Sequence, residues 1–231
     1  MSRRLRVHIP GGVYHVTLRG NHRQDIFGDR ADRSTLDSMV RGAAERTGAR
    51  ILAYCWMTNH IHLVIQAGDQ PLGRLMQMVG SKYARYRQQR AGTTGHLFER
   101  RYHAVLVARE HQLAHVVRYV HLNPVRAGLV AEPAEFQWSS HRQYLGLSDA
   151  PWVWPEALLS LLAGDLTEAR RIFTAFCGEA LSDPARMDAA RDLLIRGGKP
   201  EVRLGRSQVG PTLTLDEIIA EVCGRSGLPE H

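Results

Sequence analysis

Two histidines separated by one residue are the first feature of this 231-residue chain that could do chemistry. They lie in the apolar run Asn59–Val64, which has the sequence NHIHLV. In a strand, residues i and i+2 point to the same face, so His60 and His62 project together while Ile61 and Leu63 face the other way. Two neighbouring imidazoles suit a divalent cation whose third ligand comes from elsewhere in the chain. The alternative is a pair of half-buried histidines satisfied by hydrogen bonds alone.

A tyrosine and an asparagine further along the chain could complete such a site. Tyr119 and Asn123 are one helical turn apart and would share a helix face with His115. A tyrosine hydroxyl can act as the nucleophile in phosphoryl transfer, although its ordinary pKa of about 10 requires a positive neighbour or a base. Asn123 offers a carbonyl oxygen, which suits Mg²⁺ or Mn²⁺. Equally, Tyr119 could be a packing residue. Asn123 could simply end the helix, since it precedes Pro124.

The pattern of apolar residues predicts the elements that would position these side chains. Strands are expected at 13–19, 50–56, 60–66 and 102–107, the middle two forming a hairpin. Helices are expected at about 32–47, 71–89 and 110–122, the last stopped by Pro124. The first six elements have the order βαββαβ. We therefore predict an α+β fold with a ferredoxin-like core, an antiparallel sheet and the helix that carries Tyr119 after the fourth strand.

A small helical region is expected after this core. Residues 1–150 would form the first domain and residues 151–231 a helical C-terminal region, joined by a linker at 151–155. Helices are expected at 156–162, 166–176 and 185–195, and a second linker at 196–211. Thr214–Glu217 forms a capping box that would open a last helix.

The charge of the chain favours a phosphate-bearing partner. The net charge is +7, and the 30 basic residues include two lysines, so 28 are arginines. A genome that favours arginine codons would give the same excess. No apolar run reaches membrane-spanning length, and the three widely spaced cysteines fit a reducing cytoplasm without a zinc-finger pattern. The candidate DNA-contacting residues are Arg3, Arg4, Arg19, Lys82, Arg85, Arg87 and Arg90.

Several motifs, in the same order along the chain, resemble those of one family. Residues 59–64 together with 119–130, which has the sequence YVHLNPVRAGLV, resemble the single-tyrosine HUH transposases, which mobilise or process single-stranded DNA. Within that group the sequence is most similar to the transposases associated with repetitive extragenic palindromes. Residues 95–102 and 136–144 resemble the same branch, and the likeness covers about residues 8–146.

This resemblance implies roles for individual residues. His60 and His62 would hold Mg²⁺ or Mn²⁺, Tyr119 would attack a DNA phosphodiester, and Asn123 would take the place of the polar residue one turn later. The products would be a 5′-phosphotyrosine link and a free 3′-hydroxyl, which can reverse to join strands. The resemblance further implies single-stranded hairpin DNA as partner and a bacterial cytoplasmic, nucleoid-associated location, with monomer or homodimer left open. It implies no role for His115 and His121, which we expect on the helix surface.

Two other functions stay open at this stage. A hydrolytic metal phosphodiesterase with a structural Tyr119 is disfavoured by Val64, where a histidine-triad hydrolase would have a third histidine. A domesticated DNA-binding protein without catalysis is supported by the C-terminus: Thr214–Gly227 resembles the start of the helix-turn-helix domain of bacterial replication initiators, but too few residues follow for a complete three-helix reader.

Overall fold

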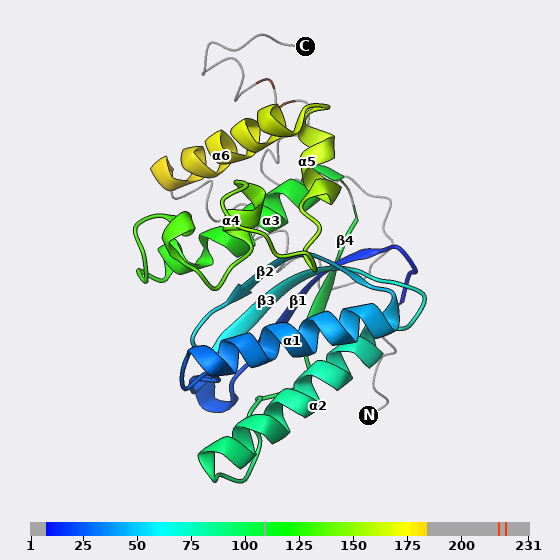
Figure 1. Ribbon diagram of the computed structural model, residues 1–231, viewed down its shortest axis with the longest axis vertical. Helices are drawn as coiled ribbons and strands as arrows, with labels where there is room; N and C mark the ends of the chain where they lie inside the picture. Colours follow the sequence, from blue (N-terminus) through cyan, green and yellow to red (C-terminus); the bar gives the residue numbers. More distant parts are fainter. Residues whose placement is uncertain (1–7, 109, 184–216, 218–219, 221–231) are drawn as a thin grey trace, which may run out of the picture.

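A four-stranded antiparallel sheet forms the centre of the computed structural model (Figure 1), which describes residues 8–108, 110–183, 217 and 220. Helices α1 (Arg30–Thr47) and α2 (Leu72–Ala91) connect its strands, which lie in the order β2-β3-β1-β4. This order and the βαββαβ connectivity confirm the predicted ferredoxin-like core. The strands are β1 (Val13–Arg19), β2 (Arg50–Trp56), β3 (His60–Gln66) and β4 (His103–Val107).

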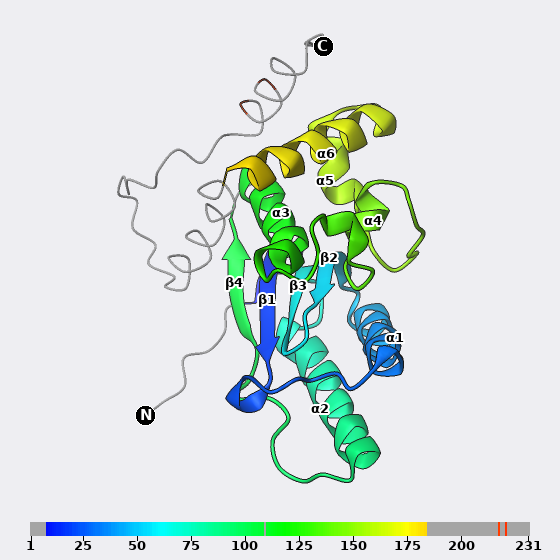
Figure 2. The same cartoon turned by 90° about the vertical axis from the view of Figure 1, so that its left-hand side faces the viewer.

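Helices cover both faces of the sheet. Helices α1 and α2 pack on one face, and α3 (Glu110–Arg126) packs on the other, where α5 (Glu156–Leu162) and α6 (Leu166–Ser182) form an outer layer over it (Figures 1 and 2). Short helical turns complete the elements: η1 (Asn21–Arg23), η2 (Pro133–Glu135) and α4 (His141–Tyr144). Within the described part of the chain, no helix is both long enough and apolar enough to span a lipid bilayer.

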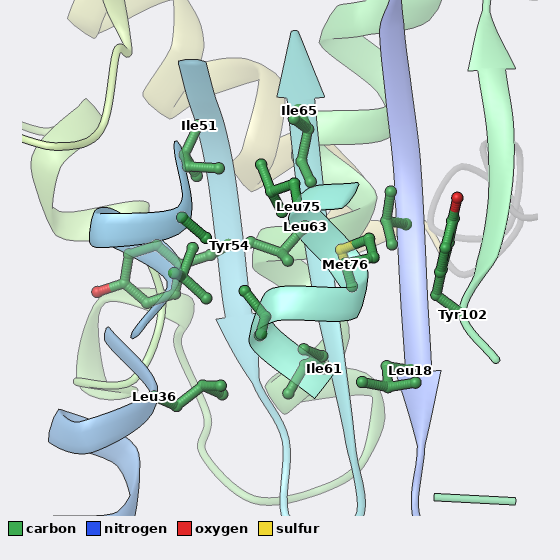
Figure 3. Close-up of a cluster of buried hydrophobic side chains, with 14 of the residues drawn as sticks. Leu18, Leu36, Ile51, Tyr54, Ile61, Leu63, Ile65, Leu75, Met76 and Tyr102 are labelled. Carbon is green, nitrogen blue, oxygen red and sulfur yellow. The ribbon is translucent and has the colours of Figure 1, made fainter. Parts of the chain in front are cut away.

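The alternation of side chains in β3 decides where its histidines lie. Ile61, Leu63 and Ile65 are buried in the core beneath α1 and α2, where Leu75 and Met76 of α2 lie over them (Figure 3). Val64 belongs to the other core, together with residues of α3, α5 and α6. His60 and His62 therefore share the face that α3 covers, as the i and i+2 spacing predicted.

Helix α3 differs from the prediction at its end, because it continues past Pro124 to Arg126. Proline removes its own N–H donor, but its carbonyl still accepts, here from the backbone N–H of Leu129 at 2.9 Å. So close to the end of the helix the loss of one donor is tolerated, and Gly128, with φ of 67°, lies in the left-handed conformation just beyond it. The helix thus ends four residues after the predicted end at about 122, so the prediction that Pro124 stops it was wrong.

The expected surface position of His115 and His121 was also wrong, because both side chains are buried. The outer layer of helices covers the face of α3 that points away from the sheet. His115 packs edge-on against Phe176 of α6, and the His121 ring packs against Phe173 of α6 and Tyr144 of α4.

The segment expected as a linker at 151–155 packs on the edge of β2. Val153 is buried, and the backbone N–H of Trp154 donates to the carbonyl of Ile51 at 2.9 Å. Helices α5 and α6 share one hydrophobic core with α3. The expected helix 185–195, the linker 196–211 and most of 214–227 lie outside the described residues, as do Arg3 and Arg4.

A buried carboxylate joins α1 to α2. The Asp32 side chain is fully buried and accepts from Arg87 Nη1 at 2.6 Å, from Arg90 Nη1 at 2.6 Å and from the backbone N–H of Gly28 at 2.6 Å. Because Asp32→Ala would leave the largely buried Arg87 without its carboxylate, we expect the free energy of unfolding to fall by about 3 to 5 kcal/mol in chemical denaturation.

The exposed pair between Arg41 and Glu45 of α1 is the matched control. Glu45→Ala removes a carboxylate from an arginine on the same helix, but in solvent, so it should cost no more than about 0.5 kcal/mol. Equal losses in the two variants would contradict a stabilising role for the buried group.

Candidate active site

A cavity of about 460 Å³ opens between the sheet and α3. The strands present to it the side chains that alternate with the core: His15 and Thr17 of β1, and His60 and His62 of β3. Tyr119 of α3 lies against the same cavity. The remaining lining residues are Arg19, Glu99, Arg100, Arg101, His103 and Val105.

The structure brings Tyr119 together with the two predicted metal-binding histidines. The Tyr119 ring stands perpendicular to the His62 ring, with 5.6 Å between their centroids, and His60 and His62 are 4.8 Å apart by the same measure. The Arg126 guanidinium lies over the Tyr119 ring, 5.1 Å from its centre. His62, which strand alternation places on this face of β3, thus contacts Tyr119 of α3.

Each of these histidines has its Nδ1 atom hydrogen-bonded. His60 Nδ1 lies 2.7 Å from the side-chain oxygen of Asn59, and His62 Nδ1 lies 3.0 Å from Nε2 of His15. His62 Nε2 is buried and has no hydrogen-bond partner among the described residues. The arrangement resembles that of metal-binding histidines, which typically use one ring nitrogen as the ligand and the other for a hydrogen bond.

Burial favours the neutral form of three of the cavity's histidines, His15, His60 and His62. It lowers the pKa of His15 to about 3, with a smaller contribution from the charge of His103. Burial and then Arg19 lower the pKa of His60 to about 4, and burial holds the pKa of His62 well below its ordinary value. Neutral imidazole is the form that binds a metal ion, so these side chains would not have to release a proton at neutral pH.

The imidazoles of His60 and His62 fit a metal ion that takes two nitrogen ligands at this cavity. The neutral rings of His60 and His62 would be the nitrogen ligands, and the buried Nε2 of His62 has no hydrogen-bond partner among the described residues. Asn123 is largely buried, and its amide nitrogen donates to the carbonyl of Tyr119 at 2.7 Å, so its Oδ1 atom is the candidate ligand. Asn123 is not among the described residues that line the cavity. The described residues also contain no cluster of three or more His, Cys, Asp or Glu side chains that could hold a metal ion.

Positive charge surrounds the cavity. Arg19, Arg100 and Arg101 are exposed side chains at its wall, and Arg126 lies beside Tyr119. Among the described residues of the lining, Glu99 is the only acidic one, and it lies 3.7 Å from Arg100. A phosphodiester placed beside Tyr119 would therefore lie within a positive field.

The predicted DNA-contacting arginines fall into different environments. Arg19 lies at the cavity, and Lys82 and Arg85 are exposed on α2. Arg87 and Arg90 instead form ion pairs with Asp32 of α1, which gives them a structural role, and Arg90 also pairs with Asp29 at the start of that helix. A second hollow, of about 780 Å³, lies between α2 and residues 95–102 and shares Glu99, Arg100 and Arg101 with the first.

Sequence reasoning missed several lining residues, namely His15, Thr17, His103, Arg100 and Arg101. Alternation in 13–19 would have placed His15 and Thr17 on one face of a strand. That this face is the one with His62 depends on the pairing of β1 with β3, in which Thr17 lies opposite His62. His103 also lies opposite Thr17, on β4, so three strands meet at this point.

Comparison with known proteins finds a matching family model and a solved structure of the same fold. The family model described as "Transposase IS200 like" matches residues 9–123, a span that includes both predicted metal-binding histidines, Tyr119 and Asn123. A search of curated proteins found no significant match. One solved structure, described as that of a REP-associated tyrosine transposase bound to a REP hairpin, has the same fold: the TM-score is 0.54 at 19% identity, covering 72% of this chain and 94% of that one.

Proposed function

The chain belongs to the IS200-like transposase family, and we propose that it cleaves and rejoins single-stranded hairpin DNA through a 5′-phosphotyrosine intermediate. The observation that carries this proposal is the meeting of Tyr119 with His60 and His62 at one cationic cavity. A hydroxyl nucleophile, a pair of neutral imidazoles and several arginines are the groups that phosphoryl transfer needs in one place.

In the proposed reaction the Tyr119 oxygen attacks the phosphorus of a DNA phosphodiester. The bond from phosphorus to the 3′-oxygen breaks as the new O–P bond forms, the tyrosine proton is lost, and the departing 3′-oxygen takes up a proton. The fragment downstream of the break, which keeps the phosphate at its new 5′ end, stays joined to Tyr119, and attack by the free 3′-hydroxyl reverses the step. Arg126, next to the tyrosine ring, together with Arg100 and Arg101 would counter the charge that builds on the phosphate oxygens.

His60, His62 and Asn123 would hold Mg²⁺ or Mn²⁺. When bound, the ion would polarise a phosphate oxygen and offset charge in the transition state. The described residues contribute nitrogen and oxygen donors of the kinds that such ions accept.

The partner we propose is a folded single strand of DNA. The structural neighbour of the same fold is bound to a REP hairpin, and the cationic wall of the present cavity suits a phosphate backbone. With bacterial DNA as its substrate, the protein would act in the cytoplasm at the nucleoid.

The proposed function is tested with single-stranded hairpin DNA labelled at its 5′ or its 3′ end and incubated with the protein and Mn²⁺. Denaturing electrophoresis should show a protein band carrying the 3′-labelled fragment, because the 5′-phosphate of that fragment is the one joined to tyrosine. The 5′-labelled fragment should run free with a 3′-hydroxyl. Cleavage that never leaves label on the polypeptide would point to hydrolysis by water.

Binding should be salt-dependent and should favour a hairpin over a perfect duplex of the same sequence. Removing Arg100 or Arg101 should weaken hairpin binding and reduce the slope of log K against log salt by about 1 for each lost phosphate contact. Fluorescence anisotropy over a salt series measures both quantities. The control is Arg41→Ala, which removes an exposed arginine from α1 on the opposite face of the sheet. Equal affinity for hairpin and duplex would contradict hairpin recognition.

A further inference from the structure

His60 and His62 are each held by a side chain that contacts Nδ1, and for His60 the direction of that hydrogen bond is fixed. Asn59 Nδ2 donates to the carbonyl of Arg23 at 3.1 Å, so the other atom of the same amide, Oδ1, faces His60. An amide oxygen only accepts, and the proton of the 2.7 Å hydrogen bond must therefore reside on His60 Nδ1. The Nε2 atom of His60 then carries a lone pair.

In the hydrogen bond between His62 Nδ1 and His15 Nε2, either nitrogen could be the donor. In one, His62 Nδ1–H donates to His15 Nε2, and the buried Nε2 of His62 carries a lone pair. In the other, His15 Nε2–H donates, and the proton of His62 lies on Nε2, where no acceptor is available among the described residues. A buried N–H without an acceptor is costly, whereas a lone pair at the same atom is available to a ligand.

His15 itself is not placed to be a third ligand. Its ring is stacked on that of His62, with 5.2 Å between centroids and 17° between planes, and its Nε2 faces the Nδ1 edge of His62. The Nε2 edge, where a ligand would bind, is the other side of the ring. His15 thus lies at the Nδ1 side of His62, opposite the Nε2 atom. A group that orients a metal-binding histidine typically lies at this position.

We propose that His15 is a positioning residue: it accepts the Nδ1 proton of His62 and so turns the Nε2 lone pair of His62 toward the cavity. The inference deepens the proposed function and rests on it, since it assigns how the site is prepared for Mg²⁺ or Mn²⁺. With Asn59, it gives His60 and His62 the same protonation pattern, in which the lone pair of each ring lies on Nε2.

The first test is made on the metal-free protein. Long-range ¹H–¹⁵N NMR spectra of the imidazoles report which ring nitrogen carries the proton. We expect His62 to be protonated at Nδ1 in the wild type. In His15→Phe, which keeps a ring in the same space but removes the acceptor, the proton should move to Nε2. His15→Gln, whose Oε1 can accept the same hydrogen bond, should restore the wild-type pattern. A wild-type His62 protonated at Nε2 overturns the proposal.

The second test is Mn²⁺ binding, measured by electron paramagnetic resonance without DNA. Loss of an orienting group typically costs about 10 to 100-fold in metal affinity, so His15→Phe should bind that much more weakly and His15→Gln should recover most of the loss. The control is His141→Phe, which replaces another buried histidine by phenylalanine, on the far side of α3, and should bind Mn²⁺ as the wild type does. Equal affinity in all four proteins would overturn the proposal. If no protein binds Mn²⁺, the metal-dependent function fails, while the NMR result still decides the role of His15.

Discussion

Tyr119→Phe is expected to abolish both strand cleavage and the covalent adduct while the protein folds, binds the hairpin and holds the metal as before. The substitution keeps the ring, which packs beside His15 and His62 and beneath the Arg126 guanidinium. It deletes only the attacking oxygen. Loss of the nucleophile in a covalent mechanism typically lowers the rate upwards of ~10⁴-fold. Gel assays of cleavage and of labelled polypeptide measure both products of the reaction.

The matched control is Tyr86→Phe on α2. It also removes one tyrosine hydroxyl, here one that donates to Asp32 at 3.1 Å, far from the cavity. The control should lose about 1 kcal/mol of stability and retain full cleavage. A hydrolytic phosphodiesterase predicts a different outcome, because water would attack and Tyr119→Phe would keep most of its activity. A Tyr119→Phe protein that cuts as well as the wild type would exclude tyrosine as the nucleophile.

The elements of the core were predictable because their residues obey short-range periodicity. Strands β2 and β3 begin and end where alternation and the hairpin residues 57–59 placed them, and the apolar positions of α2 are the ones buried. Tyr119, His60 and His62 could be predicted as site residues because each lies in a short sequence motif. The division into domains at residue 150 stays a prediction.

The surroundings of the site could not be predicted, because they depend on contacts between distant segments. His15 meets His62 only through the pairing of β1 with β3, and the histidines 115 and 121 become buried only because α4 and α6 close over α3. Arg87 and Arg90, which were predicted to contact DNA, form ion pairs with Asp32 of α1, and this pairing of two helices could not be predicted from the sequence. Helix periodicity shows which face is polar, but a polar face can serve a neighbouring helix as well as DNA.

Removal of the metal ion or of a histidine that would hold it is expected to have the second large effect. His60→Ala and His62→Ala should each lower cleavage by about 10³-fold or more, since a bound metal ion contributes several kcal/mol to the transition state. Hairpin affinity should change little, because binding rests on arginines such as Arg19, Arg100 and Arg101. Chelation should reduce wild-type cleavage to the level of these variants, and added Mn²⁺ should restore it in the wild type alone.

Asn123→Ala should lie between these variants and the wild type. It removes the proposed oxygen ligand but leaves both imidazoles and the attacking hydroxyl, so excess Mn²⁺ should recover part of its cleavage. Because His62 is buried, its variant needs a folding control, and His141→Phe provides one: it replaces a buried histidine outside the cavity and should keep full metal-dependent cleavage. If His60→Ala and His62→Ala fail to fold, and chelation leaves the wild type fully active, the two histidines serve the core and the proposed metal site is wrong.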